Sequence, residues 1–288
     1  MIKGKASYPF ETLALVVVFT SRLEALIAET KRFAGLFSAK VVFIHVGKRT
    51  SYKEKQLSRQ LLAYGFNDSN CAVHWQDGSP VDIILTVCKQ HVVDLLIMDP
   101  HEQESTLKLG TGSNAREITR KAKCSVMMMV DPQTHPVPFR KFVVNGYDHD
   151  KTIHTINTTI YFAECEGARD ILVVDEMELP AVSLSPMEEM NDRDTMLVKS
   201  TFVRDENSKI SSLLMLLDKK NMDIKMKTVS GRSGYTIAQF ARHAKADLLV
   251  VNSPDHHLNI FDRIFSHDLE YVLVDLPCNI LLVHSRVF

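Results

Sequence analysis

The chain has 288 residues, of which 45% are hydrophobic and 24% are charged, and its formal net charge at pH 7 is −1. The length predicts about two domains, because single domains usually span roughly 100–200 residues, and the balanced charge argues against nucleic-acid binding. The five cysteines are odd in number and lack a C-x-x-C spacing, which favours a reducing, cytoplasmic setting over a disulfide-stabilised secreted protein.

Strands and helices alternate along the first part of the chain. The apolar run at 13–19 is far shorter than the ~20 residues that span a membrane, and no signal-peptide cleavage site follows it, so it predicts a buried strand. Residues 21–37 then show the periodicity of an amphipathic helix. The expected elements after that are a strand at 40–46, a helix at 53–65, an alternating, edge-like strand at 71–77, a helix at 81–91 that the turn at 78–80 opens, a strand at 94–99, a helix within 110–124 and a strand at 125–130.

The second part of the chain repeats the first. VDLLIMD at 93–99 matches ADLLVVN 153 residues later, and CSVMMMV at 124–130 matches CNILLVH 154 residues later. A period of this size indicates two tandem domains rather than a solenoid. We place them at 1–133 and 134–288, joined through the proline-rich segment 131–139. The strands expected in the second domain lie near 141–147, 170–175, 223–229, 247–252 and 279–284.

Each domain is predicted to be a five-stranded α/β unit. Continuous apolar strands that alternate with helices indicate a parallel sheet covered on both faces, which right-handed crossovers wind in both directions. An acidic, methionine-rich insert at about 177–204 interrupts the second domain. It is interpreted as a disordered loop, with a flap over a neighbour as the alternative. Cys88, Cys124 and Cys278 are interpreted as packing residues.

A glycine-rich stretch, GTGSNAREITRKAKC at 110–124, leads into the last helix of the first domain. Backbone N–H groups of such a loop can hold a phosphate at a helix N-terminus. Ligands of doubly wound sheets bind beyond the carboxyl ends of the strands, where the end of the first strand also lies. The candidate residues for nucleotide or phosphate binding are therefore Gly110, Thr111, Gly112, Ser113 and Asn114 from the loop, with Thr20 and Ser21.

With this loop, with GSP at 78–80 and with DLLIMD at 94–99, the chain resembles the universal stress protein family in its tandem form. The resemblance implies a Rossmann-like strand order of 3-2-1-4-5 and pairing of the two domains through their fifth strands. Family members that bind nucleotides carry an acidic residue at the end of the first strand. They also carry two glycines in a G-x-x-G pattern, followed after nine residues by glycine and a hydroxyl residue.

The chain departs from the nucleotide-binding pattern that this resemblance implies. Asp99 and Glu102 stand at the two early glycine positions, and Phe19 stands at the acidic position. Carboxylates repel a phosphate that glycine would let approach, and phenylalanine accepts no hydrogen bond from adenine or ribose. Two alternatives follow. The loop retains weak affinity for ATP or phosphate, or it caps its helix while Phe19 fills the adenine position.

The second domain departs further from the pattern. Tyr147 or Asp148 takes the acidic position, and Ser266-His267 take the last glycine position. The candidate crevice residues of this domain are Asp148, His149, Ser253, Ser266 and His267. His149, His256 and His257 are weak metal candidates, because neither H-x₃-H nor H-E-x-x-H spacing occurs, so solvated loop histidines are favoured.

No catalytic residues are predicted, since the chain has neither a G-x-S-x-G elbow nor a Walker lysine after GTGSN. The hypothesis is a non-enzymatic, cytoplasmic stress-response or regulatory module with no certain cofactor and with ATP as a possible one; a weak ATPase activity stays open. Its expected partners are proteins and a possible nucleotide, without nucleic acid or membrane. Pairing of the domains within one chain and a possible homodimer are also expected. The alternatives are a metal- or small-ligand-binding protein or enzyme with a His/Asp site in the second domain, and an interaction scaffold.

Overall fold

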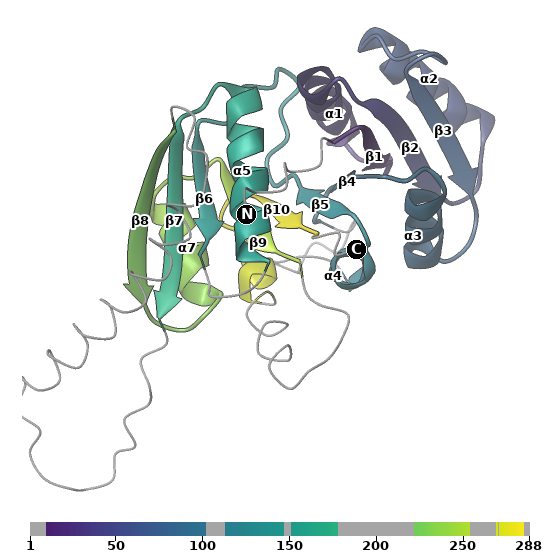
Figure 1. Ribbon diagram of the computed structural model, residues 1–288. Helices are drawn as coiled ribbons and strands as arrows, with labels where there is room; N and C mark the ends of the chain where they lie inside the picture. The colour runs from purple at the N-terminus through teal and green to yellow at the C-terminus, as the bar shows by residue number, and fades with distance from the viewer. Residues whose placement is uncertain are drawn as a thin grey trace, which may run out of the picture.

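The computed structural model describes residues 10–101, 113–146, 151–177, 222–253, 269 and 271–284. Within these residues ten strands form one sheet in the order β3-β2-β1-β4-β5-β10-β9-β6-β7-β8 (Figure 1). The strands are β1 (Thr12–Val16), β2 (Lys40–Val46), β3 (Cys71–Gln76), β4 (Leu95–Met98), β5 (Ser125–Met128), β6 (Lys141–Asn145), β7 (Asp170–Met177), β8 (Asp223–Ser230), β9 (Leu248–Asn252) and β10 (Asn279–Val283). Each half thus has the order 3-2-1-4-5, and the predicted α/β fold class is confirmed.

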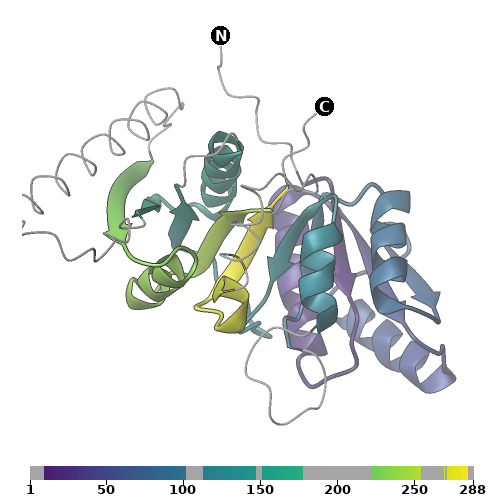
Figure 2. The same ribbon diagram turned by 90° about the horizontal axis from the view of Figure 1, so that it is seen from below.

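Helices cover both faces of the sheet (Figure 1, Figure 2). Side chains from α1, α2 and α5 share one hydrophobic core with one face, and side chains from α3, α4 and α7 share another with the opposite face. This is the double winding that continuous apolar strands predict. The described helices are α1 (Leu23–Phe37), α2 (Ser51–Ala63), α3 (Pro80–Gln90), α4 (Ser113–Lys121), α5 (Thr152–Glu166) and α7 (Tyr235–His243).

Local sequence signals explain several element boundaries. Helix α2 begins two residues before the predicted start, because the Thr50 side chain caps it by accepting a hydrogen bond from Lys53 N. The same helix ends just before Gly65, whose φ of 71° suits the left-handed turn there. Pro80 opens α3 as expected, although the Ser79 side chain makes no capping bond.

The two halves meet where β5 and β10 pair antiparallel, while every other strand pair among the described residues is parallel. The register places Met127 opposite Leu281, and both side chains are fully buried. We call this strand pair the seam. Because β5 and β10 run in opposite directions, the carboxyl ends of the two halves face opposite edges of the sheet. The predicted pairing through the fifth strands is therefore present within one chain.

Equivalent hydrogen bonds close the two ends of the seam. Val130 N donates to Asn279 Oδ1 over 2.9 Å, and His284 N donates to Ser125 Oγ over 3.2 Å. The donors are 154 residues apart, and so are the acceptors, which is the repeat period read from the sequence. The sequence repeat is thus matched by a repeat of these hydrogen bonds in the structure.

A second repeated contact fixes the start of the central strand in each half. One carboxylate oxygen of Asp94 accepts hydrogen bonds from the backbone N–H groups of Glu11 and Thr12. In the second half, Asp247 binds the N–H groups of Arg140 and Lys141 in the same way. The aspartate of the repeated sequence thus accepts hydrogen bonds from backbone N–H groups at the amino end of the central strand, which is a structural role.

Two predicted strand boundaries differ slightly from the observed ones. The first strand was expected at 13–19 but ends at Val16. Strand β7 runs two residues beyond the expected 170–175. The predicted edge position of β3 is confirmed. The predicted insert at about 177–204 lies outside the described residues from 178 onward.

Candidate functional site

The first-half candidate site lies beyond the carboxyl ends of β1 and β4. Six residues connect β1 to α1 and carry Phe19, Thr20 and Ser21. The Thr20 hydroxyl accepts a hydrogen bond from Arg22 N over 3.3 Å, and Ser21 is exposed. These two predicted residues thus lie at the turn into α1, and the Thr20 hydroxyl serves that turn.

Phe19 lies against the ends of the neighbouring strands. Its ring stacks on Trp75 of β3 with 6.1 Å between centroids, and it meets His45 of β2 edge-on at 4.9 Å. The Lys53 ammonium lies 5.4 Å from the centre of the Phe19 ring, within the range of a cation–π contact. We call Phe19, His45 and Trp75 the aromatic cluster. It places apolar ring surface where the family pattern has a carboxylate.

His45 is held neutral inside this cluster. Burial lowers its pKa, and the charge of Lys53 lowers it further, against the opposing effect of a hydrogen bond with Val17. Nδ1 lies 2.9 Å from Val17 O and Nε2 lies 3.4 Å from Lys53 Nζ. Nδ1 therefore carries the proton that is donated to the carbonyl, and Nε2 accepts from the ammonium.

Asp99 forms an ion pair across the crevice with Arg22. The Arg22 side chain starts at the N-cap of α1, and its Nε lies 2.7 Å from Asp99 Oδ2. Its second guanidinium nitrogen, Nη2, donates to Met129 O over 3.0 Å and to Val130 O over 2.8 Å. One side chain thus ties the ends of β4 and β5 to the start of α1. The Asp99 carboxylate, at an early glycine position of the family pattern, is buried beside this cation.

The structure describes only part of the predicted first-half site. Ser113 and Asn114 form the exposed first turn of α4. Gly110, Thr111 and Gly112 lie outside the described residues. Sequence reasoning missed Arg22, His45 and Trp75. The signal for Arg22 is its place directly after Thr20-Ser21, at the expected start of a helix.

The second-half crevice has a related arrangement with a different basic residue. Lys151 stands at the N-cap of α5, as Arg22 does in α1, and its ammonium donates to Ser253 O over 3.3 Å. Ser253 itself is buried, and its Oγ lies 3.4 Å from Nδ1 of His284. In place of Asp99 this half has Asn252, which is bonded to two threonine hydroxyls of α5. The carboxyl end of β9 is thus tied to α5 by neutral contacts and one lysine.

Equal spacing favours one of the two alignments that the sequence leaves open. Six residues separate β1 from α1, and six separate β6 from α5, so Asp148 is the counterpart of Phe19 by count. The other predicted second-half residues, His149, Ser266 and His267, lie outside the described part with Asp148. So do the metal candidates His256 and His257. Among the described residues no group of three or more His, Cys, Asp or Glu side chains could hold a metal ion.

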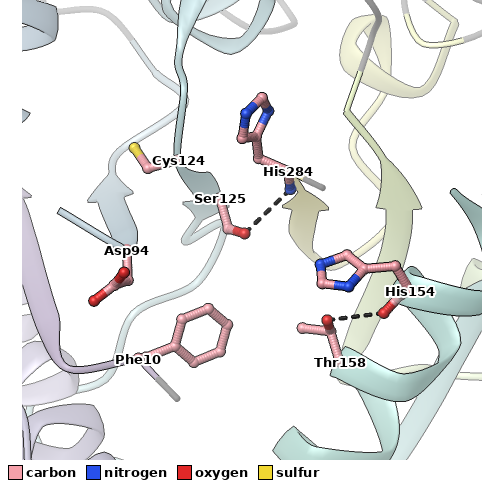
Figure 3. A pocket seen from close by; sticks show the side chains of 7 residues that line it. All are labelled: Phe10, Asp94, Cys124, Ser125, His154, Thr158 and His284. Atoms are coloured by element: carbon pink, nitrogen blue, oxygen red, sulfur yellow. Dashed lines mark hydrogen bonds between the residues drawn. The ribbon is translucent and has the colours of Figure 1, made fainter. Parts of the chain in front are cut away.

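A small cavity lies between the halves, beside one end of the seam (Figure 3). Its volume is about 20 Å³, which suits about one water molecule. His154 from the first turn of α5 and His284 from the end of β10 face this space with Asp94 and Ser125. Burial lowers the pKa of His154, so this ring is neutral near pH 7. The cavity is too small for a nucleotide.

The fold is that of a tandem α/β protein, in which two doubly wound units are joined through the pairing of their fifth strands, β5 and β10. Residues 47–129 match the family model described as the Universal stress protein family. This match covers a part of the first half, from just after β2 to the end of β5, and agrees with the resemblance read from the sequence.

Solved structures show the same fold over nearly the whole chain. A functionally unknown protein from Pseudomonas aeruginosa PAO1 is 14% identical, with a TM-score of 0.71, over 96% of this chain and 93% of that one. A universal stress protein from Archaeoglobus fulgidus DSM 4304 is 12% identical, with a TM-score of 0.61, over 95% and 97%. At this identity the likeness concerns the fold. In the part of the chain that the structure describes, no helix is long and apolar enough to cross a membrane.

Proposed function

We propose that this protein is a cytoplasmic regulatory module of the universal stress protein type, which catalyses no reaction and whose first-half crevice works without bound nucleotide. The observation that supports the proposal most directly is the ion pair between Arg22 and Asp99. The Asp99 carboxylate stands at an early glycine position of the family pattern. The nearby cation, Arg22, is already paired with it.

The charge balance of the crevice disfavours a nucleotide. A phosphate close to Asp99 would meet a carboxylate with only 7% of its side chain exposed, and Arg22 already serves that carboxylate and two backbone carbonyls. To bind phosphate, Arg22 would have to leave these partners, and like charges would remain close together in a partly desolvated site. The ion pair therefore competes with the ligand that the family pattern serves.

The adenine side of the crevice supports the same proposal. An acidic side chain at the end of the first strand would accept hydrogen bonds, whereas Phe19 accepts none. Its ring contacts Trp75 and His45, so moving it aside would give up these aromatic contacts. Such pairs contribute about 0.5–1.5 kcal/mol each beyond their buried area.

The test is calorimetry of the full chain with magnesium and ATP, together with mass spectrometry for nucleotide that remains bound through purification. We expect no retained nucleotide and no binding heat up to about 1 mM ATP, a limit that corresponds to roughly −4 kcal/mol. Trp75, the chain's one tryptophan, reports on the same crevice by fluorescence. A dissociation constant well below this limit, or ATP that stays bound through purification, would overturn the proposal.

A double variant tests the physical reason. Phe19→Asp with Asp99→Gly restores the acidic residue and one glycine of the family pattern, and we expect it to bind ATP measurably. Asp131→Asn, an exposed change beyond β5, is the matched control and should bind none. Metal analysis of the same preparations tests the alternative of a His/Asp site in the second half; stoichiometric zinc would favour that alternative.

A further inference from the structure

Two of the five cysteines lie side by side although 36 residues separate them in the sequence. Cys88 is in the last turn of α3, and Cys124 directly precedes β5. Among the causes that shift the pKa of the Cys88 thiol, the neighbouring Cys124 thiol is the largest, and both cysteines are free. Because α3 and α4 pack together, the end of α3 and the residue before β5 lie beside each other, and Cys88 and Cys124 line the same pocket.

Both thiols line a surface pocket of about 540 Å³ between the ends of α3 and α4. This volume is in the range of small-molecule sites, roughly 300–1,000 Å³. Leu85 and Val93 supply apolar surface beside the two sulfur atoms. The pocket lies at the amino ends of β4 and β5, at the other edge of the sheet from the first-half crevice. It is therefore separate from the candidate nucleotide site.

Three lysines give this pocket a positive rim. Lys89 stands in the last turn of α3, and Lys121 and Lys123 stand at and just after the end of α4. Glu117 pairs with Lys121 over 2.6 Å on the exposed surface, and the charge of Asp82 also acts on Lys121, so the rim has acidic neighbours as well as lysines. A small molecule with carboxylates fits the remaining positive charge, and a reactive sulfur on that molecule would meet the two thiols.

We infer that Cys88 and Cys124 form a dithiol site at which a small, carboxylate-bearing disulfide oxidises the protein to a Cys88–Cys124 disulfide. One cysteine thiolate attacks a sulfur of the small disulfide, which breaks that S–S bond and releases one thiol. The second cysteine then attacks the protein-side sulfur of the mixed disulfide, and the second small thiol leaves. Two cysteine thiols are oxidised and one small disulfide is reduced to two thiols, so atoms and electrons balance.

The environment of the pair makes this reaction slow near neutral pH and faster in alkali. The hydrogen bond with Cys124, and after it burial, raise the pKa of the Cys88 thiol, so little thiolate is present at pH 7. The thiolate is the attacking species, and the rate should therefore rise by up to about tenfold per pH unit. The site thus responds to sustained exposure to oxidised thiols rather than to brief exposure.

The test uses the full chain, reduced and then freed of reductant, with oxidised glutathione as the carboxylate-bearing probe. Intact mass should fall by about 2 Da, because disulfide formation removes two hydrogens, and peptide mapping should join the peptides of Cys88 and Cys124. Cys88→Ser should instead leave a stable glutathione adduct on Cys124. Cys71→Ser and Cys165→Ser, at half-buried positions, are the matched controls and should still form the bond.

The lysine rim is tested by charge. Cystamine, a cationic disulfide, should react more slowly than oxidised glutathione, and Lys121→Gln with Lys123→Gln should reduce this difference. The inference is overturned if the folded wild-type chain keeps both thiols free, or links other cysteines, under conditions that oxidise the protein in denaturant. Equal rates for the two probes would overturn the role of the rim. Peptide mapping of the wild type decides the question even if a serine variant fails to fold.

Discussion

Among single residues, Arg22 couples the crevice of the first half to the stability of that half. Its guanidinium lies beside the buried Asp99 carboxylate and donates to two carbonyls at the end of β5. Without it, the buried Asp99 carboxyl group loses its cationic partner and the two carbonyls lose a donor. Leaving such groups unpaired costs about 1–3 kcal/mol each. Arg22, whose ion pair competes with a nucleotide in our proposal, thus also connects α1 to the ends of β4 and β5.

Arg22→Met retains an apolar stem and removes the charge. We expect the free energy of unfolding to fall by about 1–3 kcal/mol, measured by urea unfolding with Trp75 fluorescence. Arg49→Met is the control, since Arg49 and Glu54 form an ion pair on the exposed surface, and such pairs contribute about 0–1 kcal/mol. Equal effects of the two substitutions would show that the Arg22 contacts contribute no more than an exposed pair.

The residues of the first-half crevice differ in how well the sequence predicts them. Phe19 and Asp99 are found by counting from a motif, because each occupies a defined position in a pattern. Arg22 has no such position, and its carbonyl partners are 107 and 108 residues away. His45 and Trp75 meet Phe19 because β2 and β3 are parallel and in register. Contacts of this kind depend on pairing, which a local pattern does not specify.

At the scale of elements, α1 and α5 pack across the boundary between the halves. Their contact contains an aromatic core, in which Phe33 and Phe162 lie 5.7 Å apart between ring centroids. Beside it Arg32 pairs with Glu29 of its own helix over 3.1 Å and with Glu166 of α5. Two buried carboxylates therefore share one guanidinium. Burial raises the pKa of Glu29 despite the opposing effect of Arg32.

This raised pKa makes the contact dependent on pH. The folded protein holds the Glu29 proton more tightly than the unfolded chain, whose value is near 4.5. The resulting stabilisation is complete below pH 4.5 and is lost as the pH rises through the folded-state pKa. Glu29→Gln removes this titration. We therefore expect the stability of the wild type, relative to Glu29→Gln, to fall as the pH rises from about 4.5.

Urea unfolding of both proteins between pH 4.5 and neutral pH checks this expectation. Glu117→Gln, at an exposed ion pair, is the control and should show no such decline. A wild type that gains stability over Glu29→Gln with rising pH would contradict the sign, and would mean that the charge of Arg32 outweighs burial at Glu29.

The sequence predicts the elements themselves better than their ends. Every described strand lies within or close to a predicted strand, and the inner strands coincide with continuous apolar runs because burial on both faces requires continuous apolarity. The run at 13–19 extends past the end of β1 at Val16, since Val17 is buried and Phe19 is partly buried outside the strand. Apolar character marks what is buried, whereas a strand ends where pairing ends. The end of the apolar run and the end of the strand coincide only when the loop that follows is polar.

At the scale of the whole molecule, the repeat predicts two similar units but does not predict their junction. An apolar fifth strand would suit a covered edge as well as a seam. The expectation of a seam came from the family resemblance, and the structure confirms it in the antiparallel pairing of β5 with β10. Ten paired strands with shared cores on both faces imply that the halves unfold together, although the sequence repeat suggests two independent domains.

Leu281→Ala tests this coupling, because Leu281 lies in β10 of the second half and faces Met127 across the seam. Its side chain is fully buried, and truncation of a buried leucine costs about 2–5 kcal/mol. Trp75 lies in β3, at the far edge of the first half. If the sheet unfolds as one unit, the transition seen by Trp75 fluorescence should move to lower urea together with that seen by circular dichroism.

Val137→Ala, at a residue that is 66% exposed between the halves, should leave both transitions in place. The informative contrast is between the two probes in Leu281→Ala. If the circular dichroism transition splits while Trp75 unfolds at the wild-type urea concentration, the first half is stable without its partner and the seam joins two independent domains. Coincident shifts mean that a cavity in β10 lowers the stability of β3, five strands away along the sheet. The strands between them then unfold as one cooperative unit.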